Sequence, residues 1–111
     1  MEKGLPEFLQ KTIKEYPEVW ESYQGLGAAI AAVDGIDKRT QHLVKLGIAI
    51  GRGVEGGVHS HVRRCREAGI PDKEIYHAAL LAVTTAGWPQ AVAALSWIDD
   101  VLKAIGGKGK K

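Results

Sequence analysis

The sequence predicts an all-α protein that folds as a compact helical bundle of about five to six helices. Apolar residues recur at spacings of three and four along most of the chain, which is typical of amphipathic helices. No segment alternates apolar and polar residues with the period of two that a strand requires. Prolines and glycines divide the chain into segments of helical length.

Two short helices are predicted in the N-terminal third, one on each side of Pro17. The first extends from about Leu5 to Tyr16 and has Pro6 in its first turn, where a missing backbone N–H is tolerated. The second extends to about Val33 and keeps apolar residues at the same helical period.

The third predicted helix, KRTQHLVKLGIAIGRG, begins after Asp37, whose carboxylate is a suitable N-cap. Between Leu43 and Ile50 only Lys45 is polar. A helix that is apolar on nearly every face is covered by its own core or by another subunit. A small bundle offers little cover, so we expect the chain to self-associate.

Three further helices are predicted in the C-terminal half, each bounded by glycine or proline. One begins near Glu55 and ends at Gly69, a residue suited to the left-handed turn that closes helices. The next has acidic residues in its first turn, after Pro71, and ends at Gly87. The last begins at Pro89 and repeats apolar residues at alternating threes and fours.

Length and charge limit the domain organisation and the partners. We expect one domain over residues 1–105, followed by a disordered basic tail over 106–111. No apolar run reaches the length of a membrane span, and the N-terminus lacks the apolar centre of a secretory signal. With a net charge of only +2, and with the basic run HVRRCREAG interpreted as a solvated helix face, we expect a soluble, cytoplasmic protein without nucleic-acid or membrane partners.

Histidines and the one cysteine supply the candidate reactive groups. On a helix, residues four apart share a face, whereas residues two apart diverge by about 200°. His61 therefore shares a face with Cys65, and His59 shares a different face with Glu55. The first pair is either a base and an activated thiol or a histidine beside a small buried hydrophobe. We favour the second interpretation, because no resolving thiol exists in the chain.

A metal site formed by Glu55, His59, His61 and His42 is the other interpretation that we considered. Its spacing matches none of the compact zinc patterns, so we expect no metal and no organic cofactor. His77 is expected to be an isolated structural or surface histidine.

From about Leu26 to Ile105 the chain resembles the carboxymuconolactone decarboxylase and alkylhydroperoxidase D-like superfamily. The segments that carry the resemblance are the apolar helix, the short glycine-containing joint after it, SHVRRCREAGIPDKEI and AGWPQAVAAL. The resemblance implies an alkylhydroperoxidase D-like fold and assembly as a homotrimer or homohexamer.

Peroxidase-type members of this superfamily carry a glutamate in the apolar helix, then a Cys-x-x-Cys motif and a histidine. On this chain the glutamate position is His42, and the cysteine positions are Val54 and Gly57. Only the histidine, at His61, is retained. The resemblance therefore argues against a dithiol peroxidase, because neither cysteine of the motif is present.

The decarboxylase branch also lacks the dithiol and keeps a histidine in a segment similar to SHV. That branch acts on γ-carboxymuconolactone without metal or organic cofactor. The resemblance implies His61 and His42 as catalytic residues, and Arg52 or Arg63 as groups that hold the carboxylates of a small carboxylic acid or lactone substrate. Further candidate substrate-binding residues are Glu55 and His59.

Two alternatives to this function stay open at the level of the sequence. One is a non-catalytic oligomeric member of the family that binds a small ligand or a partner protein. The other is thiol-dependent peroxidase activity, which would depend on Cys65 alone.

Overall fold

A computed structural model of the chain describes residues 5–106, and all of its regular secondary structure within that range is α-helical. The predicted all-α class and the upper estimate of six helices are therefore confirmed for the described residues. The helices are α1 (Glu7–Glu15), α2 (Pro17–Ala31), α3 (Lys38–Arg52), α4 (Glu55–Glu67), α5 (Asp72–Ala82) and α6 (Trp88–Gly106).

The main departure from the predicted helix bounds is at the end of α5, which stops at Ala82 rather than near Gly87. The backbone N–H groups of Thr85, Ala86 and Gly87 all donate to the carbonyl oxygen of Ala82, so the chain turns on itself instead of continuing the helix. Gly87 has a φ of +112°, which glycine adopts readily, and α6 begins at the next residue.

The chain divides into two compact units, residues 1–35 and residues 36–111. In the first unit, α1 and α2 meet at Pro17, the first residue of α2, and contain no buried residue. The rings of Trp20 and Tyr23 lie 5.9 Å apart, centroid to centroid, on α2. The expectation of a single domain over 1–105 stays a prediction, and residues 107–111 of the predicted tail lie outside the described range.

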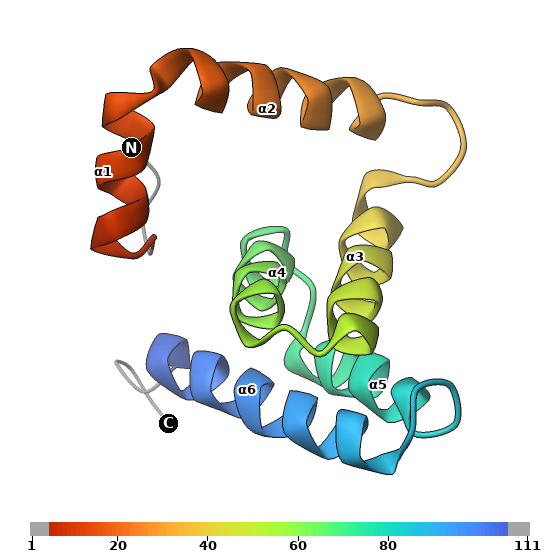
Figure 1. The fold of residues 1–111 in the computed structure, drawn as a ribbon. Helices are drawn as coiled ribbons and strands as arrows, with labels where there is room; N and C mark the ends of the chain where they lie inside the picture. The colour runs from red at the N-terminus through yellow and green to blue at the C-terminus, as the bar shows by residue number, and fades with distance from the viewer. Residues whose placement is uncertain (1–4, 107–111) are drawn as a thin grey trace. The chain divides into compact units, whose positions relative to one another are not determined.

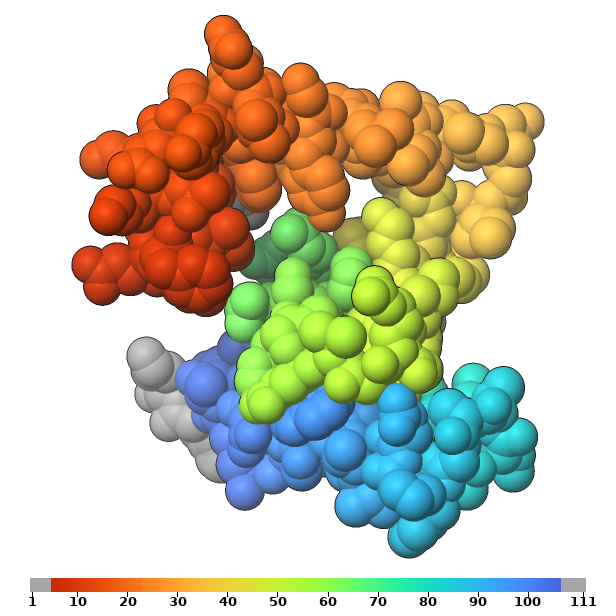
Figure 2. All heavy atoms as spheres, in the orientation of Figure 1, coloured from red at the N-terminus to blue at the C-terminus, as the bar shows by residue number. Residues whose placement is uncertain are grey.

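In the second unit, α4 packs against both α3 and α6, and α5 packs against α3 and α6 (Figure 1). The space-filling view shows the side chains of α3, α4 and α6 in continuous contact on the face it presents (Figure 2). Every buried residue that the structure describes is apolar or the cysteine. The largest fully buried side chains are Leu46, Ile50, Ile70, Ile75, Ile98, Val58, Val62 and Cys65.

Local capping fixes both ends of α3. The Asp37 carboxylate accepts a 2.7 Å hydrogen bond from the backbone N–H of Thr40, which confirms the predicted N-cap. At the other end Gly53 has a φ of +72°, and a Cβ added there would lie 2.5 Å from Nε2 of Gln90. That amide donates to the carbonyl oxygen of Gly51 at 3.1 Å. A residue of α6 thus holds the end of α3 in place.

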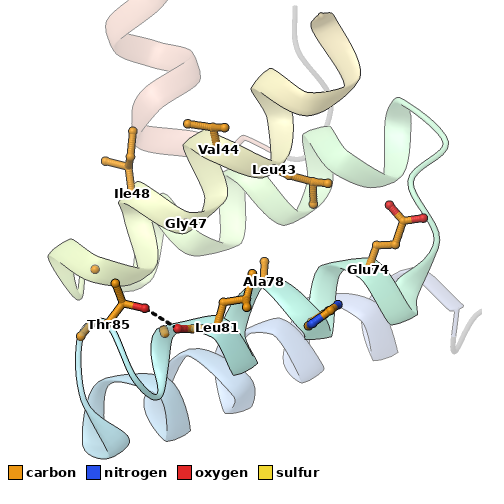
Figure 3. Close-up of a pocket in the computed structure, with 12 residues that line it drawn as sticks. Leu43, Val44, Gly47, Ile48, Glu74, Ala78, Leu81 and Thr85 are labelled. Atoms are coloured by element: carbon orange, nitrogen blue, oxygen red, sulfur yellow. Dashed lines mark hydrogen bonds between the residues drawn. The ribbon is translucent and has the colours of Figure 1, made fainter. Parts of the chain in front are cut away.

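Two apolar side chains of α3 are exposed, Val44 by 42% and Ile48 by 56%. They border an apolar groove of about 740 Å³ between α3 and α5, with Glu74 at one end and Thr85 at the other (Figure 3). The second unit by itself therefore leaves part of the apolar surface of α3 uncovered.

Spanning a bilayer takes about 20 predominantly apolar residues in one helix. Within residues 5–106, no helix combines that length with sufficient hydropathy.

Candidate functional site

A two-residue joint between α3 and α4 creates the candidate site. The N–H of Gly53 donates to the carbonyl oxygens of Ala49 and Ile50, and the left-handed conformation of this glycine turns the chain sharply after α3. Val54 then precedes α4, which begins at Glu55. As a result, the last turns of α3 lie beside the first turns of α4.

A cavity of about 180 Å³ lies in the angle between these two helices. The helices lie close together at Gly57, where an added Cβ would make ordinary van der Waals contact with Cβ of Ala49 at 3.6 Å. The lining residues are Lys45, Ile48, Ala49 and Arg52 of α3, Val54 of the joint, and Gly57 and His61 of α4.

His61 is the titratable group at the centre of this arrangement. Burial lowers its pKa below 6.5, and the neighbouring charges of Arg64, Lys45 and His42 lower the pKa further. Its Nδ1 atom is buried and has no hydrogen-bond partner within the described chain. The ring is therefore neutral near pH 7.

The charged residues that line the cavity are both cations, Lys45 and Arg52. No carboxylate is among the described lining residues, so a small anion would meet attraction from both cations without a competing acid. Arg52 was a sequence candidate, whereas Lys45 was not. The sequence could have identified Lys45, because it is the one polar residue in the apolar stretch of α3 between Leu43 and Ile50.

Two other candidates, His42 and Arg63, do not line the cavity. His42 acts on the site at a distance, because its charge is one of the causes that lower the pKa of His61. Arg63 is half-buried on α4, and the arginine that influences His61 is its neighbour Arg64.

Glu55 and His59 belong to a second cluster, on another face of α4. Nε2 of His59 lies 3.6 Å from Oε2 of Glu55, as the spacing of four residues predicts. Asp100 of α6 joins them, and one ligand atom from each of the three residues lies within 4.8 Å of the other two. Sequence reasoning missed Asp100, because only the packing of α6 on α4 brings it there.

Cys65 lies in the core between α4 and its neighbours. Its Sγ donates to the carbonyl oxygen of His42 at 3.6 Å, and burial raises the pKa of the thiol to about 11. The thiol is therefore protonated at neutral pH, where a nucleophile would need to be a thiolate. This environment supports the interpretation of Cys65 as a small buried hydrophobe.

Comparison with known proteins adds a family and one relative. The model of the carboxymuconolactone decarboxylase family matches residues 17–100, a range that contains the whole cavity lining and the cluster on α4 and α6. An uncharacterized protein of Haemophilus influenzae is 35% identical over 48 residues, which cover 43% of this chain and 42% of the relative. The aligned part is thus less than half the length of that relative.

Proposed function

The chain belongs to the carboxymuconolactone decarboxylase family, and from this premise we propose that it decarboxylates a small lactone or carboxylic acid, or catalyses closely related chemistry, without a cofactor. The observation that carries the proposal is the cavity between α3 and α4, where a neutral histidine lies beside two cations. Positive charge beside the reacting group stabilises the anion that forms when carbon dioxide departs.

The size of the cavity favours a small substrate. Sites for drug-sized ligands have volumes of about 300–1,000 Å³. This cavity has about 180 Å³, and its walls combine apolar side chains of Ile48, Ala49 and Val54 with the two cations. A compact acid with one or two carboxylates fits both the volume and the charge.

In the proposed reaction Lys45 and Arg52 hold the substrate carboxylates through charge-assisted hydrogen bonds. The bond between the departing carboxylate and its carbon breaks, carbon dioxide leaves, and the electron pair passes into a dienolate. His61 then donates a proton to carbon and recovers one from water. The nearby cations stabilise the dienolate until the proton arrives.

His61 must be protonated for this role, although burial and cations lower its pKa. A bound dianionic substrate places negative charge beside the ring and offsets the positive charge of Lys45. Substrate binding therefore raises the pKa of His61, and the ring takes up a proton. His42 lies outside the cavity, and its electrostatic effect lowers the pKa of His61, so it has no step in this scheme. Arg63, Glu55 and His59 lie outside the cavity and have no step in this scheme.

The decisive test is turnover of γ-carboxymuconolactone by the purified full chain, followed as release of carbon dioxide. We expect His61→Ala to lower kcat by about 100-fold, the usual contribution of a positioned general acid. His77→Ala is the control, because this exposed histidine of α5 lies outside the cavity.

Each other outcome of that test has a clear meaning. Wild-type protein that binds the acid without releasing carbon dioxide would identify the chain as a non-catalytic binding member. Consumption of hydroperoxide with a thiol reductant, lost in Cys65→Ser, would establish the thiol-dependent alternative instead. Turnover that survives His61→Ala unchanged would contradict the role proposed for this residue.

We propose further that the chain assembles as a homotrimer or homohexamer. The exposed Val44 and Ile48 and the apolar groove between α3 and α5 support this, because apolar surface of this extent on a small unit is stabilised by burial against a partner. Light scattering at micromolar concentration should give three or six times the chain mass of 12.0 kDa. A cooperatively folding monomer under the same conditions would refute the assembly.

A further inference from the structure

We propose that α4 and α6 form a binding site for a divalent transition-metal ion, with Glu55, His59 and Asp100 as ligands and Zn²⁺ as the ion that suits them. The three residues offer two carboxylates and one imidazole from two packed helices. The site is separate from the His61 cavity and does not depend on the proposed decarboxylation.

The ligand atoms already lie near the separations that a bound ion requires. Zinc binds histidine nitrogen and carboxylate oxygen at about 2.0–2.2 Å, so two ligands of a tetrahedral site are about 3.3 Å apart. Oε2 of Glu55 and Nε2 of His59 are 3.6 Å apart, and the full set lies within 4.8 Å. Glu55 and Asp100 are exposed, so a rotation of either side chain closes the remaining distance.

An unpartnered nitrogen points independently to a ligand. Nε2 of His59 is buried from solvent and makes no hydrogen bond to any described residue, whereas its distance to Glu55 is too long for one. A buried polar atom without a partner destabilises the folded chain. Coordination of an ion by Nε2, with the ring proton on Nδ1, removes this cost.

The backbone positions of the three ligands are held by the core. Glu55 and His59 are four residues apart on α4, and Val58, between them in sequence, is fully buried. On α6, Val101 and Leu102 follow Asp100 and are buried. The ligands therefore stand on rigid helices rather than on a loop, as a precise metal site requires.

Neighbouring interactions single out Asp100 rather than Asp99 as the third ligand. Asp99 accepts a hydrogen bond from the Tyr76 hydroxyl at 3.0 Å and pairs with Lys103 at 3.0 Å. Asp100 forms no ion pair with any residue in the described range. Asp100 adds to the effect of Asp99 in raising the pKa of Lys103, but one of its carboxylate oxygens lies within 4.8 Å of the ligand atoms of Glu55 and His59.

The donor set selects the class of ion. Calcium and magnesium take oxygen ligands, whereas imidazole suits zinc and the other first-row transition ions. Three protein ligands also leave room for one or more water molecules, as in open zinc sites. We therefore expect Zn²⁺ to bind and Mg²⁺ at the same concentration not to compete.

The test is calorimetric titration of Zn²⁺ into the tag-free, chelator-treated full chain, with circular dichroism to confirm that each variant is folded. We expect one Zn²⁺ per chain, and binding about tenfold weaker or more in His59→Ala and Asp100→Asn. Loss of a residue that only hydrogen-bonds to a metal ligand already weakens metal binding about 10–100-fold. The matched controls are His77→Ala and Asp99→Asn, which should bind as the wild type does.

Binding of Co²⁺ gives a second, spectroscopic readout that is independent of calorimetry. Co²⁺ bound through His59 should show visible d–d absorption that disappears in His59→Ala, and Glu55→Gln should change the spectrum while the protein stays folded. Absence of stoichiometric Zn²⁺ binding by the wild type would overturn the proposal. So would binding that survives His59→Ala and Asp100→Asn, or that is lost with His61→Ala instead. Turnover that persists in the presence of chelator would leave the two proposals independent of each other.

Discussion

His59 and His61 are two residues apart on one helix, and both are half-buried, yet their surroundings have opposite charge. His61 faces α3 and lies near Lys45 and Arg64, which lower its pKa. His59 faces α6 and lies between the carboxylates of Glu55 and Asp100. The chemistry available to a histidine on α4 is therefore decided by the helix that packs against it.

This contrast assigns the two faces of α4 to different ligands. The face toward α3 suits a small anion, because its charged lining is cationic. The face toward α6 suits a cation, because two carboxylates lie beside an imidazole nitrogen. Side chains two residues apart on a helix point about 200° away from each other, so the cavity at His61 and the cluster at His59 lie on separate faces.

Removing one of the two cations that α3 places in the cavity should weaken anion binding on that side of α4. Lys45→Met deletes a charged partner of the substrate carboxylate, a contact worth about 1.5–3 kcal/mol, so we expect KM to rise about 10- to 100-fold. Steady-state kinetics on the carboxylic acid substrate measures this. Lys38→Met, in the exposed first turn of α3, is the matched control. An unchanged KM in Lys45→Met would show that the anion does not bind in this cavity.

A change in the joint should disturb the cavity through the backbone. Gly53→Ala places a Cβ 2.5 Å from Nε2 of Gln90 at a φ of +72°, so the variant must break the contact between α6 and the end of α3. Left-handed strain and the loss of the Gln90 hydrogen bond together should destabilise the fold by about 2 kcal/mol. Thermal unfolding measures the loss.

The control for that experiment is Gly51→Ala. Gly51 lies within α3, and a Cβ there meets nothing within 4 Å. Alanine in a helix interior is favoured over glycine, so this variant should be as stable as the wild type or slightly more so. Equal stability of Gly53→Ala and Gly51→Ala would argue against the strain assigned to the joint.

Most of the local structure could be predicted from the sequence, because helices are specified by neighbouring residues. The Asp37 cap, the left-handed Gly69 and the separate faces of His59 and His61 depend on short-range spacing, and the structure shows all of them. The end of α5 was misplaced, because turns that converge on the Ala82 carbonyl look like a helix in periodicity alone.

The composition of the two sites could be predicted only in part. Arg52 and Arg63 were both chosen as cations that could hold a substrate carboxylate, but only Arg52 lines the cavity. Gln90 and Asp100 come from α6 and reach α3 and α4 only through tertiary packing. A periodic pattern identifies the face that a residue occupies but not the helix that this face meets.

The smallest expected effect is the change in stability with pH that the titration of His61 causes. His61 has a lowered pKa in the folded chain, so the unfolded chain binds more protons between that value and 6.5. Stability should therefore rise with pH across this window and level off above about pH 6.5, and it should be lost as the pH falls. His61→Gln, which cannot titrate, should flatten this part of the profile in thermal unfolding measured at a series of pH values.

The ring resonances of His61 in NMR should titrate below the usual range and move to higher pH in Lys45→Met, because that variant removes one of the charges that oppose protonation. A titration of His61 at or above 6.5 in the wild type would contradict the partial burial and the neighbouring positive charge on which the contrast between the two faces of α4 depends.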